Sequence, residues 1–397
     1  MNKFIPFIIL LIFMINLSAQ NNEEQMNTLI EETRLKFAPD KRTAIFNVSF
    51  TQDGDICTVT GETDNPVAIK YFLEKLTESK INFKEKISLL PSIQIGERKF
   101  GVVTVSVANL RTKPDHPAEL ASQALLGTPV KVLKYDDGFY LVQTPDKYIA
   151  WVDSDAIELF NLADFKIYID SRKVIFVKEY GFAFRDDSEL SGHVSDLTKG
   201  NILEFVDESK EFIKVKFPDG RMAFLEKSDA VLLDDWSKTR NPDAQSILGE
   251  AFNMMGIPYL WGGTSYKGID CSGFTKTVFF LNGILLSRDA SQQVNQGEGI
   301  NTQSGFENLL PGDLLFFGRK ANENKKERIT HVGIYIGNME YIHESGSVKI
   351  NSFDPNSPIF SIHRLSQFVR AKRILTSVGS NGIEKISENK FYKGEIN

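Results

Sequence analysis

The chain has 397 residues, of which 42% are hydrophobic and 25% are charged. This composition is that of a globular protein and excludes disordered and collagen-like classes, while the length allows roughly two to four domains. The net charge of −6 argues against nucleic acid or an anionic membrane as a partner, because both require a basic surface.

Residues 1–19 are predicted to be a signal peptide. They contain one lysine, then an apolar stretch, then small residues, and cleavage after Ala19 would leave Gln20 or a neighbour as the mature start. A membrane anchor is the alternative, but the apolar run is short for a membrane span and a polar segment follows it. We therefore expect an exported protein, periplasmic or extracellular, that is not stably inserted in a membrane after cleavage.

Residues 20–99 are predicted to form a small α+β module with no recognisable chemistry. Hydrophobic alternation indicates strands at 42–50, 55–63 and 82–90. A helix is expected from Pro66 to Ser79, because Asn65 is a suitable N-cap and proline is favoured at the first helical position.

Residues 100–160 and 161–234 are predicted to be two copies of one small β-barrel. Each copy consists of short β-branched and aromatic runs separated by Gly, Pro and Asp, as in small barrels. Three landmarks recur at offsets of 73, 73 and 74 residues: Gly127 and Gly200, the Pro-Asp turns at 145–146 and 218–219, and the Ser-Asp-Ala segments at 154–156 and 228–230. The copies resemble bacterial SH3-like domains in V-A-N-L-R-T-K-P at 107–114, G-T-P-V-K-V-L at 127–133 and Y-I-A-W-V at 148–152.

Residues 235–376 contain the residue types on which catalysis would depend, and the polar segment 377–397 is left without structure. Helical spacing of hydrophobic residues predicts helices over 244–256 and from Cys271 onward, with Asp270 as the cap of the second. A cysteine at a helix start faces unpaired N–H groups. These would lower the thiol pKa and provide donors to an oxyanion.

The chain has two cysteines, Cys57 and Cys271. A disulfide between them is one explanation in an exported protein. They lie more than 200 residues apart in different predicted domains, however, and Cys57 has the alternation of a strand core position. We expect Cys57 to be a buried small hydrophobe and Cys271 to be a free thiol, which requires a functional explanation.

His331 and His343 lie on one predicted β-hairpin. With the loop at 337–339, His343 would oppose Gly333 and His331 would lie diagonally on the same face of the sheet. A two-residue loop would place the histidines on opposite faces, so a shared function requires an odd-length loop or a bulge. Two sheet histidines without a role are the alternative. Their combination with a cysteine at a helix start favours a nucleophile, a base and an orienting residue.

A metal site is the other use of one cysteine and two histidines. Zinc would need a fourth ligand or a water, and Asp270 and Asp289 are available. The chain has no C-x-x-C or H-x-x-x-H spacing, however. We therefore expect no metal and no cofactor.

Six motifs in this region together resemble the NlpC-type cell-wall cysteine peptidases. They are G-I-P-Y-L-W-G-G (256–263), D-C-S-G-F (270–274), L-S-R-D-A-S-Q-Q (286–293), L-P-G-D-L-L-F-F (310–317), T-H-V-G-I-Y-I-G (330–337) and Y-I-H-E-S-G (341–346). The resemblance implies a papain-like fold and cleavage of peptidoglycan stem peptides. It also implies Cys271 as nucleophile, His331 as general base and His343 as the residue that orients the base. Tyr259 would help to hold the oxyanion beside the Cys271 backbone N–H.

The two barrels before the catalytic domain are similar to the architecture of the γ-D-glutamyl-L-diamino acid endopeptidases, or dipeptidyl-peptidase VI. These cleave after γ-D-Glu in peptides that begin with a free L-Ala, and their first barrel lends an acidic residue and a tyrosine to the amine pocket. Glu119 and Tyr148 are the matching positions, with a solvated loop charge as the alternative for Glu119. Asp270 and Ser272 would complete the pocket. A free ammonium needs a carboxylate, and a barrel wall would block longer chains.

Arg288 and Asp289 are expected either to touch a carboxylate of the acidic substrate or to pair with each other. Trp151 and Trp261 are expected to be packing residues rather than platforms for sugars.

The sequence therefore predicts an α+β protein with a papain-like NlpC-type domain preceded by two SH3-like β-barrels and a small α+β module. The predicted activity is hydrolysis of the γ-D-Glu–diamino acid bond in murein peptides with a free N-terminal L-Ala. One alternative is a hydrolase of intact peptidoglycan that uses the barrels as wall-binding modules. Another is a catalytically inactive wall-binding protein.

Overall fold

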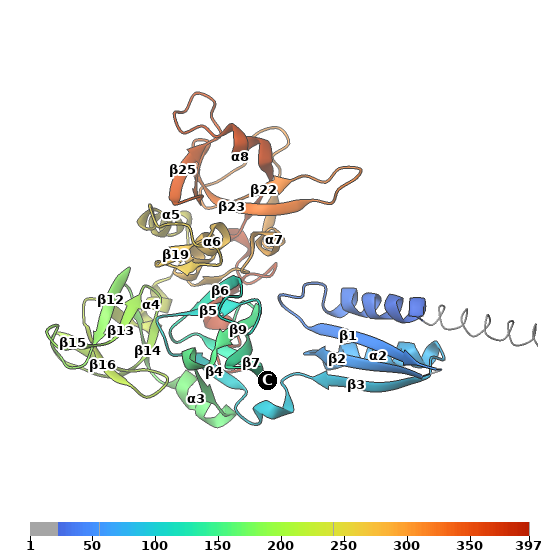
Figure 1. Ribbon diagram of the computed structural model, residues 1–397. Helices are drawn as coiled ribbons and strands as arrows, with labels where there is room; N and C mark the ends of the chain where they lie inside the picture. Colours follow the sequence, from blue (N-terminus) through green and yellow to red (C-terminus); the bar gives the residue numbers. More distant parts are fainter. Residues whose placement is uncertain (1–22, 55, 241, 397) are drawn as a thin grey trace, which may run out of the picture. The chain divides into compact units, whose positions relative to one another are not determined.

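The computed structural model (Figure 1) describes residues 23–54, 56–240 and 242–396. The chain divides into two compact units, residues 1–96 and residues 97–397. The predicted signal peptide at 1–19 lies outside the described residues. None of the described helices has the combination of length and hydrophobicity that crossing a bilayer requires.

The first unit is a three-stranded sheet that shares one core with α2 and with a helix over residues 23–37. Its other elements are β1 (Phe46–Asp53), β2 (Ile56–Thr63), α2 (Pro66–Glu78) and β3 (Phe83–Leu89). β1 and β2 are antiparallel, whereas β2 and β3 are parallel and are joined through α2. The predicted helix is confirmed, and the Asn65 side chain accepts hydrogen bonds from the first N–H groups of α2. Cys57 is buried and free in β2, as predicted.

The second unit begins with two seven-stranded sheets of identical topology, which confirms the predicted repeat. The first has the order β10-β4-β7-β8-β9-β5-β6, and the second has the order β17-β11-β14-β15-β16-β12-β13. The strands of the first are β4 (Phe100–Val103), β5 (Val107–Arg111), β6 (Leu120–Leu125), β7 (Pro129–Asp136), β8 (Phe139–Gln143), β9 (Ile149–Asp153) and β10 (Ile157–Phe160). Helix α3 (Leu162–Asp170) follows. The strands of the second are β11 (Lys173–Phe176), β12 (Tyr180–Phe184), β13 (His193–Thr198), β14 (Ile202–Glu208), β15 (Phe212–Lys216), β16 (Met222–Glu226) and β17 (Ala230–Leu232).

The repeated glycines lie where the two barrels touch. Gly127 and Gly200 have φ angles of +82° and +93°, a region that favours glycine. A Cβ on Gly127 would lie 2.3 Å from the Ile202 carbonyl oxygen in the second barrel, and one on Gly200 would lie 2.9 Å from Leu125 in the first. These two landmarks of the repeat therefore reflect both a turn conformation and a close contact between the copies.

The C-terminal part is built on a six-stranded antiparallel sheet in the order β21-β26-β22-β23-β24-β25. Its strands are β21 (Glu298–Ile300), β22 (Leu314–Arg319), β23 (Arg328–Gly337), β24 (Glu340–Glu344), β25 (Val348–Ser352) and β26 (Phe368–Arg373). Its helices are α4 (Leu233–Thr239), α5 (Ala244–Asn253), α6 (Cys271–Phe280), α7 (Ala290–Gln293) and α8 (Ile362–Gln367). Two short pairs, β18 (Thr264–Ser265) with β19 (Gly268–Ile269) and β20 (Ile284–Leu285) with β27 (Glu384–Lys385), complete it.

Helix α6 packs its apolar residues against one face of the sheet. Phe274 and Val278 are fully buried in the same cluster as Val332 and Ile334 of β23. In Figure 1, α6 lies between the large sheet that carries β23 and strands β5 and β6 of the first barrel. The helix that begins at Cys271 is therefore held from both sides, and its first residues lie next to the barrel.

The segment 377–397 is not an unstructured tail, so that prediction is wrong. β27 pairs with β20, and the Asn389 side chain donates a hydrogen bond of 3.1 Å to the carbonyl oxygen of Pro145 in the first barrel. Phe391 packs in one buried cluster with Phe100 of the same barrel. Within the described residues 377–396, the buried side chains are Ser377, Ile383, Ile386, Asn389, Phe391 and Ile396. The segment is polar on average, so its composition did not indicate that a few hydrophobic residues would be buried. Their packing partners lie far away in the sequence.

Candidate active site

Cys271 is the first residue of α6, as predicted, and Asp270 is its N-cap. Oδ1 of Asp270 accepts a hydrogen bond of 2.7 Å from the Gly273 N–H, and Oδ2 accepts one of 3.0 Å from the Gly262 N–H. Cys271 is 8% exposed and forms no disulfide. The predicted nucleophile is thus a free thiol fixed at the start of a helix.

The environment of this thiol does not lower its pKa, contrary to the prediction. Burial, helped by the neighbouring charge of Asp270, raises the pKa of Cys271 to about 12. The backbone N–H groups of Val332 and Ser272 act in the opposite direction but are outweighed. Loss of solvation therefore exceeds the effect of the helix start. In the resting protein the thiol is protonated at neutral pH, so it needs a base that removes its proton during attack.

The hairpin brings His331 and His343 together. Nε2 of His331 lies 2.7 Å from Nδ1 of His343. The loop is the two-residue type that would separate the histidines, since Gly337 pairs with Glu340, but a bulge between Tyr335 and Gly337 restores the register. The prediction of an odd-length loop or a bulge is confirmed, because a Cβ on Gly333 would lie 2.9 Å from Cβ of His343.

Asn351 on the next strand determines which nitrogens carry protons. Its Nδ2 donates to the Ile359 carbonyl oxygen at 3.0 Å, which orients its Oδ1 toward Nε2 of His343 at 2.9 Å. An amide oxygen accepts only, so Nε2 of His343 carries the hydrogen and Nδ1 of His343 accepts from Nε2 of His331. Nδ1 of His331 is then left without a proton. It is the nitrogen that can act as a base.

Both histidines are neutral at physiological pH. Burial lowers the pKa of His331 well below its ordinary value, and the charge of Arg364 and the neighbouring His343 add to the effect. Burial also lowers the pKa of His343 to about 4, although the hydrogen bond to Asn351 opposes this shift. A neutral imidazole can accept the proton of a protonated thiol directly, so neither group needs to be ionised before the reaction begins.

Replacing Asn351 with alanine should lower kcat by about 10- to 100-fold with little change in KM, because His343 loses the acceptor that fixes its tautomer. Asn351→Asp retains an acceptor oxygen and should keep most of the activity. Steady-state kinetics on the peptide substrate expected from the sequence would measure both, with the exposed Asn356→Ala as the matched control. Equal activity of Asn351→Ala and the unmodified protein would contradict the assigned proton positions.

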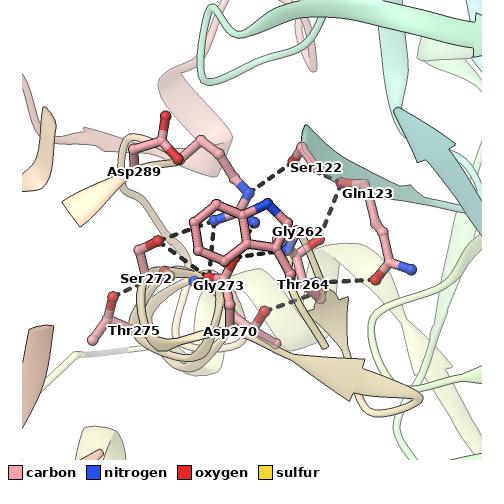
Figure 2. A network of polar contacts seen from close by, with 12 residues as sticks. Ser122, Gln123, Gly262, Thr264, Asp270, Ser272, Gly273, Thr275 and Asp289 are labelled. Atoms are coloured by element: carbon pink, nitrogen blue, oxygen red, sulfur yellow. Dashed lines mark hydrogen bonds and ion pairs between the residues drawn. The ribbon is translucent and has the colours of Figure 1, made fainter. Parts of the chain in front are cut away.

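A buried polar network adjoins Cys271 on the barrel side (Figure 2). Nη2 of Arg288 lies 2.5 Å from Oδ2 of Asp270, and its Nη1 donates to Asp270 and to Oγ of Ser272 at 3.1 and 3.0 Å. Nε of Arg288 donates at 3.1 Å to Oγ of Ser122, which belongs to β6 of the first barrel. Arg288 therefore forms an ion pair with Asp270, and the charge of the adjacent Asp289 acts on it as well. The network joins the residues on both sides of Cys271 to the barrel.

The predicted amine-pocket residues lie around this network. Oε1 of Glu119 accepts a hydrogen bond of 2.8 Å from Nε1 of Trp261, so the loop that precedes α6 is tied to the barrel. Tyr148 is buried in the barrel, close enough to Arg288 that an ionised Tyr148 would raise the pKa of Arg288. Trp261 is 61% exposed and is not the packing residue that was expected. The structure thus places Glu119 and Tyr148 on the side of the barrel that faces Asp270 and Ser272.

The charge of Asp270 acts on two further titratable groups, Tyr259 and Glu344. Burial raises the pKa of Tyr259 above its ordinary range, with the charges of Cys271, Asp270 and Glu344 adding to the effect, so its hydroxyl stays protonated. Glu344 is fully buried, and burial raises its pKa to about 7, with Asp270 acting in the same direction. Among the described residues its two carboxylate oxygens have no hydrogen-bond partner. Within the same described ranges, no three His, Cys, Asp or Glu side chains converge as metal ligands would.

Comparison with known proteins decides the family. Residues 256–369 match the NlpC/P60 family, and residues 110–157, in the first barrel, match the bacterial dipeptidyl-peptidase SH3 domain. A probable endopeptidase NlpC homolog from Haemophilus influenzae is 33% identical over 172 residues, which cover 43% of this chain and 74% of that protein. The chain belongs to the NlpC/P60 family. It is a cysteine peptidase of this family, and the predicted α+β fold class is confirmed.

Other relatives match a larger part of the chain. Dipeptidyl-peptidase 6 of Lysinibacillus sphaericus is 26% identical over 268 residues, covering 65% of this chain and 93% of that protein. The γ-D-glutamyl-L-lysine dipeptidyl-peptidase of Bacillus cereus is 27% identical over 266 residues, covering 65% of this chain and 76% of that protein. The crystal structure of an NlpC/P60 family protein from Bacillus cereus has 25% identity and a TM-score of 0.59, over 70% of this chain and 99% of that chain.

Proposed function

We propose that the protein hydrolyses the bond between γ-D-Glu and a diamino acid in murein peptides that begin with a free L-Ala. The observation that supports this proposal is the polar network that reaches from Ser122 of the first barrel to Asp270 and Ser272 beside Cys271. A barrel in this position leaves room for a short acyl chain and blocks a longer one. Two relatives that match 65% of this chain are named as dipeptidyl-peptidases, and the name of one of them specifies γ-D-glutamyl-L-lysine.

In the proposed reaction Nδ1 of His331 takes the proton of Cys271, and the sulfur attacks the γ-carbonyl carbon of D-Glu. The oxyanion is stabilised by the Cys271 backbone N–H and the hydroxyl of Tyr259. His331 then gives its proton to the leaving amine of the diamino acid, and a thioester to Cys271 remains. A water, deprotonated by His331, hydrolyses the thioester and releases L-Ala-D-Glu. His343 acts on His331 by holding its tautomer, so it is a positioning residue.

The amine of L-Ala is proposed to bind between the barrel and the start of α6. Glu119 keeps one carboxylate oxygen beyond the hydrogen bond from Trp261, and an ammonium group needs such a partner. Asp270 and Tyr148 would extend the polar wall of this pocket, and Ser272 would line its base. Because the pocket needs a free amine, the proposed substrates are peptides already released from the wall, as in peptide turnover. Export through residues 1–19 is part of the proposal.

The proposal is tested by the cleavage of L-Ala-γ-D-Glu-diaminopimelate and of its N-acetylated form, followed by mass spectrometry. We expect at least about tenfold faster cleavage of the free peptide, since a charge-assisted hydrogen bond contributes roughly 1.5–3 kcal/mol. Glu119→Gln should slow only the free peptide. Glu158→Gln, on β10 of the same barrel, is the matched control.

Equal cleavage of both peptides would remove the amine pocket and favour hydrolysis of intact peptidoglycan, with the barrels as wall-binding modules. Cleavage of sacculi in the same assay would support that alternative directly. Absence of any cleavage, with wall binding retained, would favour an inactive wall-binding protein.

A further inference from the structure

Arg364 is a half-buried arginine that has no carboxylate partner in the part of the chain that the structure describes. In helix α8 its Nη2 donates to Oγ of Ser345 at 3.2 Å, and its Nη1 donates to Oε1 of Gln367 at 3.3 Å. Across residues 23–54, 56–240 and 242–396, no ion pair to this guanidinium is present, whereas Arg288 and Arg373 are each paired with an aspartate. An arginine held by two long hydrogen bonds to neutral groups retains donors for an anion.

The guanidinium lies beside the proposed catalytic residues. It stands 5.9 Å from the centre of the Phe317 ring, and the same ring lies 5.6 Å from the ring centre of His331. Its hydrogen-bond partner Ser345 is two residues after His343 on the same chain segment. The charges of Cys271 and Tyr259 act on Arg364, and its own charge lowers the pKa of His331. Arg364 is therefore an unpaired cation at the edge of the reaction centre.

Arg364 lies on the side of the reaction centre that is opposite the first barrel. The network of Asp270, Arg288 and Ser122 approaches Cys271 from the first barrel, whereas α8 packs over β22 at the other end of the domain (Figure 1). If the acyl part of the peptide lies toward the barrel, the leaving amine lies toward His331 and Arg364. In a diamino acid the α-carboxylate is attached to the same carbon as that amine.

We propose that Arg364 binds the α-carboxylate of the diamino acid that leaves from the scissile bond. This inference rests on the proposed function and extends it to the other end of the substrate. In a tripeptide this α-carboxylate is free. In a longer stem peptide its carboxyl carbon forms an amide bond with the next residue. Arg364 therefore selects peptides that end at the diamino acid, just as the barrel selects peptides that begin at L-Ala.

The test compares three peptides: L-Ala-γ-D-Glu-L-Lys with a free C-terminal carboxylate, its C-terminal amide, and the free peptide with D-isoglutamine in place of D-Glu. We expect kcat/KM to be about 10- to 100-fold higher for the free peptide than for its C-terminal amide. Arg364→Gln should reduce this ratio to about 2 by slowing the free peptide alone. Arg364→Lys should keep part of the preference, and Arg370→Gln, which removes a surface arginine on β26, should keep all of it.

Four outcomes would overturn the inference. Equal slowing of the free peptide and its amide by Arg364→Gln would show a structural role, and thermal unfolding of the variant would report the loss of packing. An effect of Arg364→Gln that persists on the C-terminal amide but disappears on the D-isoglutamine peptide would assign the carboxylate to D-Glu. Equal cleavage of all three peptides by the unmodified protein would refute this inference alone. Cleavage of none of them would refute the proposed function as well.

Discussion

Replacement of Cys271 by alanine should lower kcat by about 10⁴-fold or more, because the alanine variant has no nucleophile to form the thioester. His331→Ala should have a similar effect, and the double variant should be little worse, since the two residues act as one unit. Mass spectrometry of digests of the tripeptide would measure all three. Cys57→Ala is the matched control, because Cys57 is also free and buried but lies in the first unit. Retention of activity by Cys271→Ala would refute the thiol mechanism.

Replacement of Asp270 by asparagine should destabilise the second unit by about 3–5 kcal/mol. The substitution leaves Arg288 charged, 1% exposed and without its carboxylate, and breaking a buried ion pair costs about this much. The intrinsic pKa of a guanidinium is so high that Arg288 stays charged after its carboxylate is removed. Urea unfolding followed by fluorescence would give the change in free energy.

The control for this experiment is Asp235→Asn, which removes an exposed ion pair to Lys238 and should change stability by less than about 0.5 kcal/mol. Combining Asp270→Asn with Arg288→Met should recover a large part of the loss, since the unpaired charge is gone. A cost below about 1 kcal/mol for Asp270→Asn would mean that water reaches the arginine and that the network is not a rigid part of the site.

Local sequence patterns were sufficient for the elements that carry the predicted catalytic residues. The helix start at Cys271 depends on Asp270 one position earlier, and the pairing of His331 with His343 depends on one hairpin. Both features involve neighbours in the chain, so spacing and capping rules describe them well. The bulge that aligns the histidines is one of the two arrangements expected, since a shared role requires an odd-length loop or a bulge.

The features that were missed depend on residues far apart in the sequence. Arg288 forms its buried ion pair with Asp270, because the tertiary fold, not chain proximity, sets the pairing. The pKa of Cys271 depends on how deeply the fold buries the sulfur, which no motif encodes. Asn351 follows His343 by eight residues, and its strand V-K-I-N-S alternates apolar and polar residues, so a polar residue at this position carried no signal of a role.

The segment 377–396 also links the folding of the barrels to residues far along the chain. Phe391 and Ile396 fill a cluster with residues of the first barrel, and Ile386 fills another with residues of the second barrel. These residues follow the catalytic domain in the chain, so the outer surfaces of both barrels are covered only after the catalytic domain has been synthesised. Removal of residues 377–396 would leave both clusters open to water and expose the chain to proteolysis.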